Sequence, residues 1–319
     1  MGFLAEYLQT MFKQQCPIGW TCHTEQRLLS ETFERRMGYS SRVDVLFRHN
    51  DGRHAVWVEF EVSRADPVAN HAKFLVAHAR NSKLHHDTFI SMVSPHVAYG
   101  RSHLAANMIF LMRKMGVQSF QTTLLPQFTA AQIKQLNALS IDLIQAYPDL
   151  YPDREVERVF TLIAPVVAMD QRRLHFVGNM LEVMLNIQTW NEQIHHVDAQ
   201  AVWGKRTVLY FVYDPLTRTF APSKFCGYLV LAADTESIHS GMTIPVYVDL
   251  DRNAPSFDGF RARTHLQKHL GMLLISNDDH PTIIRDFEQW HQGCHEQITV
   301  HPRGPNILVP PVWFRQTRH

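Results

Sequence analysis

The spacing of apolar residues predicts that the chain begins with a helix. Between residues 3 and 12 apolar side chains recur at intervals of three and four, and the segment 16–19, which contains proline and glycine, ends this pattern. A second helix is expected over residues 25–36, with Met37-Gly38 as its end. Both segments are typical of amphipathic helices that pack one face against a core.

Two β-rich segments follow, and a hairpin signal lies between them. The segments are residues 42–47 and 55–62, and Asn50-Asp51-Gly52 separates them. The pattern then predicts a helix over 66–80, a strand over 87–93, a helix over 103–115 and helical packing around 133–143 and 156–167. This order predicts an α/β fold in which helices flank a central mixed sheet.

The pattern changes after about residue 170, where short apolar runs are separated by turn residues. Strands are expected at 208–213, 228–231 and 244–248, and helices at 265–274 and 282–291. A chain of 319 residues is also long for one core, because single cores stop growing at roughly 250–300 residues. We therefore expect two domains, an α/β domain over residues 1–170 and an α+β domain over residues 171–319.

Composition narrows the class of protein. Hydrophobic residues make up 45% of the chain and charged residues 19%, which excludes a disordered protein. A net charge of +1 excludes a polybasic tail, but it is compatible with a local basic groove for nucleic acid. No apolar run approaches the roughly 18 residues of a membrane-spanning helix, and residues 1–14 lack signal-peptide features. We therefore expect a cytoplasmic protein with no membrane partner.

The predicted hairpin carries three acidic residues on one side. Side chains alternate along a strand, so Glu59 and Glu61 share a face of the second strand. With Asp51-Gly52 as a two-residue turn, Asp44 on the first strand stands directly across from Glu59. Two carboxylates roughly 5 Å apart repel each other unless a cation compensates. Mg²⁺ fits best, because it takes one or two carboxylates and leaves its other positions to water and phosphate.

An alternative is that these acids line the polar face of an exposed hairpin, as charged residues often do at sheet edges. The segments 43–47 and 56–62 are too apolar for an exposed ribbon. Since buried carboxylates need a partner, a metal site is the favoured interpretation.

An Asp on one strand, followed by a turn and Glu-x-Glu on the next strand, with helices before and after, resembles the PD-(D/E)XK nuclease superfamily. This is the fold of many type II restriction endonucleases, and the resemblance covers roughly residues 20–95. It implies a restriction-endonuclease-like core in which Asp44 and Glu59 bind the metal. Glu61 stands where the family usually has Lys, a departure that a minority of restriction enzymes share.

The resemblance also implies roles for nearby residues. Lys in such sites positions or activates the attacking water, so either Glu61 acts as the base or Lys73 or Arg64 supplies the charge. Glu25 matches the family's first-helix Glu better than Glu31 does, because it opens the second predicted helix. Arg64 and Lys73 are further candidates for contacts with the scissile phosphate, with ordinary surface charge as the alternative.

Basic, aromatic and turn residues alternate around the strands of the second predicted domain. Lys205, Arg206 and Lys224 are candidate DNA contacts there, since Lys and Arg meet phosphates or guanine while aromatic rings stack on exposed bases. Target recognition is one interpretation of this domain, and a plain folded domain is the other.

The resemblance implies a Mg²⁺-dependent endonuclease that hydrolyses phosphodiester bonds of double-stranded DNA. We favour a sequence-specific type II restriction enzyme that acts as a homodimer, because one hydrolytic site cuts one strand. The alternatives are a repair or recombination nuclease of the same fold and a DNA-binding protein that has kept the fold and lost catalysis. A small-molecule enzyme is disfavoured, since the sequence has no Gly-rich phosphate loop, nucleophile elbow or zinc-protease helix.

Overall fold

The computed structural model describes residues 2–63, 66–81, 84, 86–232, 241–253, 257–275 and 280–315. Contacts between residues divide the described chain into two units, residues 2–163 and 164–315. Each unit has its own sheets and its own set of buried apolar side chains.

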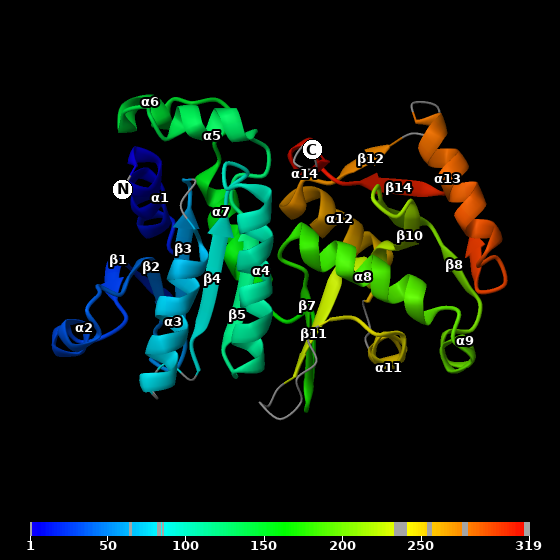
Figure 1. Ribbon diagram of the computed structural model, residues 1–319, viewed down its shortest axis with the longest axis horizontal. Coiled ribbons are helices and arrows are strands. Elements are labelled where there is room, and N and C mark those ends of the chain that lie inside the picture. The colour runs from blue at the N-terminus through cyan, green and yellow to red at the C-terminus, as the bar shows by residue number, and fades with distance from the viewer. Residues whose placement is uncertain are drawn as a thin grey trace. The chain divides into compact units, whose positions relative to one another are not determined.

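The first unit is built on a five-stranded mixed sheet (Figure 1). Its strands, in their order across the sheet, are β1 (Trp20–Arg27), β2 (Arg42–His49), β3 (Ala55–Glu61), β4 (Thr88–Val93) and β5 (Gln118–Thr123). The first three strands pair antiparallel, whereas β3, β4 and β5 pair parallel. The predicted α/β class with a central mixed sheet flanked by helices is confirmed.

Helices cover both faces of this sheet. On one face lie α3 (Val68–Arg80) and α4 (Tyr99–Lys114) (Figure 1). They contribute Phe74 and Ile109 to a buried cluster with Trp57 of β3. On the opposite face, the ring of Phe12 on α1 (Phe3–Gln14) lies 4.8 Å from the ring of Phe60. The remaining helices of the unit are α2 (Glu31–Met37), α5 (Ala130–Leu136), α6 (Ile141–Gln145) and α7 (Pro152–Ile163). The helices predicted at the start of the chain and on either side of β4 are thus confirmed.

The helix predicted over residues 25–36 is wrong in its first half. β1 continues to Arg27, and α2 covers only Glu31–Met37. Ser30 caps α2, because its side chain accepts a hydrogen bond from the N–H of Phe33, and Gly38 ends the helix in the left-handed region at φ 77°. A helix with these caps leaves the segment before Ser30 free to pair with β2.

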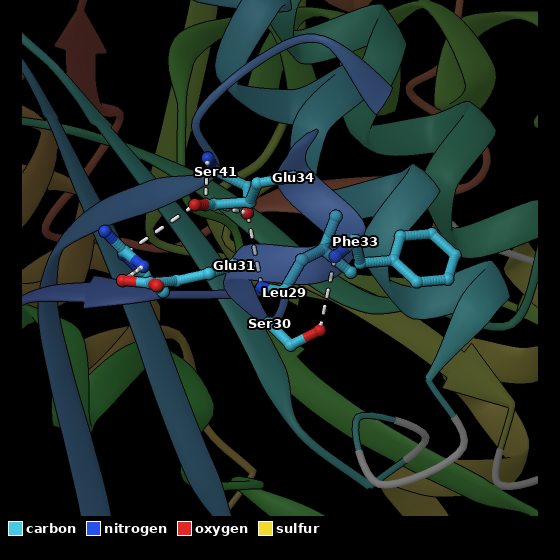
Figure 2. A network of polar contacts seen from close by, with 7 residues as sticks. Leu29, Ser30, Glu31, Phe33, Glu34 and Ser41 are labelled. Atoms are coloured by element: carbon cyan, nitrogen blue, oxygen red, sulfur yellow. Dashed lines mark hydrogen bonds and ion pairs between the residues drawn. The ribbon is translucent and has the colours of Figure 1, made fainter. Parts of the chain in front are cut away.

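A network of polar contacts fixes the corner between β1, α2 and β2 (Figure 2). The carboxylate of Glu34 accepts hydrogen bonds from the N–H of Ser41 at 2.7 Å and from its hydroxyl at 2.9 Å. Ser41 Oγ in turn accepts a hydrogen bond from the N–H of Leu29 at 3.2 Å. These contacts hold the end of β1 beside the start of β2, and those two strands carry Glu25 and Asp44.

The hairpin of β2 and β3 has the predicted register, with Val45 opposite Val58. The predicted two-residue turn is wrong, since residues 50–53 form a longer loop that is closed by the N–H of His49 donating to the carbonyl of His54 at 2.9 Å. The register survives because the loop is centred on the same peptide as the shorter turn would be.

The second unit combines small sheets with helices. Its strands form the sheets β10-β9-β14-β12, β11-β7-β6 and β13-β8. Their bounds are β6 (Val167–Met169), β7 (Arg172–Phe176), β8 (Arg206–Val208), β9 (Tyr210–Asp214), β10 (Thr219–Pro222), β11 (Tyr228–Ala232), β12 (Leu273–Ile275), β13 (Ile298–Val300) and β14 (Asn306–Val309). The helices are α8 (Met180–Gln193), α9 (Val197–Trp203), α10 (Ser223–Cys226), α11 (Ile244–Asn253), α12 (Gly259–Leu270), α13 (Pro281–Gln292) and α14 (Val312–Arg315).

One predicted strand of this unit is wrong. Residues 244–248 belong to α11, and Pro245 lies in its first turn. Proline is tolerated there because the N–H groups of the first turn have no acceptor within the helix. The helix predicted near residues 282–291 corresponds to α13. The helix predicted near residues 265–274 corresponds to α12 only as far as Leu270, because Leu273 and Leu274 belong to β12. None of the helices in the described part of the chain is both long enough and apolar enough to cross a membrane.

Candidate active site

Three acidic side chains converge at the end of the hairpin that lies away from its loop. Asp44 is near the start of β2, and Glu59 and Glu61 are near the end of β3. Only 9% of Asp44, 5% of Glu59 and 4% of Glu61 is exposed to solvent. The three acids are therefore buried, and the alternative of an exposed polar face does not apply to them.

Asp44 and Glu59 form a hydrogen-bonded pair of carboxyl groups. The backbone pairing of β2 with β3 stops at Val45, and Asp44 Oδ2 instead accepts the N–H of Phe60 at 2.7 Å. One carboxyl of the pair must carry a proton in order to donate. We assign this proton to Glu59, the more deeply buried of the two, and the negative charge to Asp44.

Polar residues continue in a row across the sheet. The pairing of β1 with β2 places Glu25 level with Asp44, and the parallel pairing places Ser91 beside Glu59 and Gln121 beside Ser91. Ser91 Oγ is buried and has no hydrogen-bond partner among the described residues. Packing of an apolar core does not require such a row, so it points to a functional role.

Glu25 belongs to this cluster, but not for the predicted reason. It does not open a helix. It lies within β1 at φ 53°, a conformation that residues other than glycine rarely adopt. The amide Nε2 of Gln9 on α1 donates to Glu25 Oε1 at 2.8 Å and to Asp44 Oδ1 at 2.9 Å. Glu31, the alternative to Glu25 in the sequence analysis, is exposed on α2 and forms an ion pair with Arg27.

Contacts with α3 hold Glu61. Asn70 Nδ2 donates to Glu61 Oε1 at 2.8 Å, and Lys73 Nζ donates to Asn70 Oδ1 at 3.2 Å. Asn70 and Lys73 are three residues apart, so they share one face of the helix. The positive charge of Lys73 acts on the acids of β3, where it lowers the pKa of Glu59 and of Glu61.

Burial dominates the electrostatics of the cluster. It raises the pKa of Asp44, Glu59 and Glu61, because a charged carboxylate loses its hydration when it is buried. The pKa of Glu61 rises to about 7. The pKa of Glu59 rises well above its usual value, since the negative charges of Asp44 and Glu61 add to the effect of burial. The cluster therefore retains protons at neutral pH that isolated carboxyl groups have lost.

The donor set fits a hard divalent cation. Carboxylate oxygens and water are the ligands that Mg²⁺ prefers, and a cation that replaced the shared proton would remove the repulsion between Asp44 and Glu59. In the described ranges no group of three or more His, Cys, Asp and Glu side chains is arranged as a metal centre. The fit therefore depends on the two predicted ligands, on the row of polar residues beside them and on water.

None of the remaining predicted DNA contacts is a described residue of the first unit. Arg64 lies outside the described residues. Lys205 is an exposed residue of the second unit. Arg206 and Lys224 belong to the same unit, and both form ion pairs with Asp251.

The sequence did not predict Gln9 or Asn70. Gln9 is only 7% exposed, and it lies among the apolar positions of α1. Its position as a polar residue within the apolar stripe of a helix is the sequence feature that could have identified it as a site residue. Asn70 is less clearly indicated by the sequence, because the only feature that could have identified it is its position one helical turn before Lys73.

Comparisons of the chain with protein-family models, with curated proteins and with solved structures found no significant match. The function is therefore inferred from the residues of the site and from their geometry.

Proposed function

We propose that the first unit is a Mg²⁺-dependent endonuclease of the PD-(D/E)XK type that hydrolyses phosphodiester bonds in double-stranded DNA. The observation that carries this proposal is the buried, hydrogen-bonded pair of Asp44 and Glu59 on adjacent strands. The mixed sheet and the position of Glu61 two residues after Glu59 are consistent with it.

Asp44 and Glu59 would hold the cation, which when bound polarises a phosphodiester oxygen and lowers the pKa of water. Glu61 is suited to accept a proton from that water, because a pKa of about 7 places it near the point of half-protonation at neutral pH. Asn70 fixes the orientation of the Glu61 carboxylate. Lys73 supplies, from α3, the positive charge that the family usually carries on the strand.

Within this class we propose a sequence-specific type II restriction enzyme that acts as a homodimer. One hydrolytic site cuts one strand, and cleavage of a duplex by two such sites requires two copies of the chain. The second unit, with its cationic and aromatic side chains, is then available to contact the DNA target.

The test is nicking of supercoiled plasmid DNA in the presence of Mg²⁺. We expect Asp44→Asn and Glu59→Gln each to lower the rate at least about a hundredfold, and to leave DNA binding in Ca²⁺ intact in a gel-shift assay. Glu31→Gln is the matched control, because it removes an exposed acid from α2 and should leave the rate unchanged. Glu61→Lys restores the usual pattern of the family, and some residual activity is expected if position 61 only orients water.

Other outcomes distinguish the alternatives. Cutting that persists in both variants would refute the site. DNA binding by the wild type without nicking under Mg²⁺ or Mn²⁺ would instead support a binding protein that has lost catalysis. Cleavage that depends on a junction, flap or lesion would support a repair or recombination nuclease.

A further inference from the structure

The second unit contains a cavity of about 610 Å³. Trp203 at the end of α9, Tyr247 on α11 and Phe257 just before α12 bring aromatic rings to its wall, and all three residues are buried. Sites for small molecules have volumes of roughly 300–1,000 Å³, so this cavity has the size of a ligand site.

Cationic side chains lie against these rings. The guanidinium carbon of Arg206 is 5.2 Å from the ring centroid of Trp203, and Lys224 Nζ is 4.5 Å from that of Phe257. Both cations also line the cavity. Asp251 forms ion pairs with both, so one negative charge holds two positive charges in place beside the aromatic wall.

A second group of rings and cations lies on the same cavity. Tyr210 and Phe260 line it, and the guanidinium carbon of Arg263 is 5.2 Å and 4.6 Å from their ring centroids. Arg303 is exposed and also lines the cavity.

Positive charge exceeds negative charge around this cavity. Arg206, Lys224 and Arg303 line it and Arg263 lies over two of its rings, whereas the described acids that line it or pair with its cations are Asp258 and Asp251. Asp258 is already engaged, because it caps α12 by accepting the N–H of Arg261 at 2.9 Å. A ligand that suits this lining is flat on one part and anionic on another.

We propose that this cavity binds a nucleoside phosphate. The base would stack on the aromatic rings, and the cations that line the cavity would meet the phosphate. A free nucleotide and an unpaired nucleotide of a DNA strand present the same chemistry. Since the described residues that line the cavity all belong to the second unit, the proposal does not depend on the nuclease activity of the first.

The test is calorimetric titration of the full-length protein with the four deoxynucleoside 5′-monophosphates, with thymidine and with inorganic phosphate. We expect at least one monophosphate to bind at least about tenfold more tightly than thymidine or phosphate alone, because it engages both rings and cations. Lys224→Ala and Arg303→Ala should each weaken that binding at least about tenfold. Arg303 is exposed, so its variant tests the site even if Lys224→Ala perturbs folding.

Arg285→Ala is the matched control. Arg285 is an exposed arginine of α13 that does not line the cavity, and its removal should leave the affinity unchanged. Failure of all four monophosphates to bind at millimolar concentration would overturn the proposal. So would equal binding of inorganic phosphate, or an affinity that neither Lys224→Ala nor Arg303→Ala alters.

A second arm identifies the source of the nucleotide. The Asp44→Asn variant, which keeps DNA intact, is titrated with a duplex that has one unpaired nucleotide and with the fully paired duplex. Preference for the unpaired nucleotide, lost in Arg303→Ala, would assign the cavity to a nucleotide displaced from a strand. Binding of monophosphates without this preference would assign it to free nucleotides. Plasmid nicking by the wild type is measured independently of both results. Failure of the nucleotide-binding proposal is therefore distinguishable from failure of the nuclease proposal.

Discussion

The burial of Glu61 gives the protein a stability that depends on pH. In the unfolded chain this carboxyl group titrates near pH 4.5, whereas in the folded protein its pKa is about 7. Between these values the folded state binds more protons than the unfolded state, so the free energy of unfolding falls as the pH rises. The acidic cluster is therefore destabilising at neutral pH in the absence of a cation.

Glu61→Gln should relieve this effect. We expect the metal-free variant to gain about 3 kcal/mol over the wild type at pH 8, from a pKa difference of roughly 2.5 units, and to match it near pH 4, where Glu61 is neutral in both states. Urea unfolding at the two pH values measures the difference. Glu31→Gln, on an exposed position, should show no such pH dependence, and an equal gain for Glu61→Gln at both pH values would contradict the prediction.

Individual site residues differed in how far the sequence could predict them. Alternation along two strands and a turn signal were enough to bring Asp44 and Glu59 together, because both rules are local. The sequence places Glu25 at the start of a helix, but in the structure it reaches the site through the register of β1 with β2. Gln9 arrives from a helix that is distant along the chain, and no local rule places its amide between two carboxylates.

At the scale of elements, the corner between β1 and β2 depends on one buried serine. Ser41 is fully buried, and its N–H and hydroxyl groups lower the pKa of Glu34, so this contact stabilises the fold above the usual pKa of a glutamate and is lost as the pH falls. The corner orients the two strands that carry Glu25 and Asp44.

Ser41→Ala should destabilise the protein by about 1–3 kcal/mol at pH 7, because it leaves the buried N–H of Leu29 without its acceptor and removes one donor from Glu34. Ser30→Ala, which removes only the cap of α2, should cost about 1 kcal/mol. Urea unfolding of both variants makes the comparison. The role of the network would be contradicted if Ser41→Ala unfolded like the wild type, or if adding Glu34→Gln to it cost as much as Glu34→Gln alone.

Elements with strong periodicity were predicted, and those formed through tertiary pairing were not. The amphipathic α1 and the apolar strands β3 and β4 can be predicted from their own residue patterns. β5 has the sequence QSFQTT, which is polar, and it is a strand because β4 pairs with it. Residues 244–248 have β-branched and aromatic side chains, yet they form the start of α11, since local propensity is weaker than packing.

At the scale of the whole molecule, the division into two units follows from strand pairing. The sequence predicts the boundary at residue 170, whereas the structure has it between residues 163 and 164. The boundary lies earlier because β6, at residues 167–169, pairs with β7 and therefore belongs to the second unit. A net charge of +1 gave no indication of function, since the sum over the chain conceals both the acidic cluster of the first unit and the cationic cavity of the second.

The proposed homodimer predicts a particular response to mixing. If each copy cuts one strand, a dimer of one wild-type and one Asp44→Asn chain has a single working site, so it should convert supercoiled plasmid to the nicked form and stop there. Wild-type dimers should continue to the linear form. Co-expressing the two chains with different affinity tags isolates the mixed dimer, and gel electrophoresis of plasmid digests counts the strands cut. Linear product formed as rapidly by the mixed dimer as by the wild type would show that one copy cuts both strands alone. Failure to recover any mixed dimer would contradict the proposed homodimer.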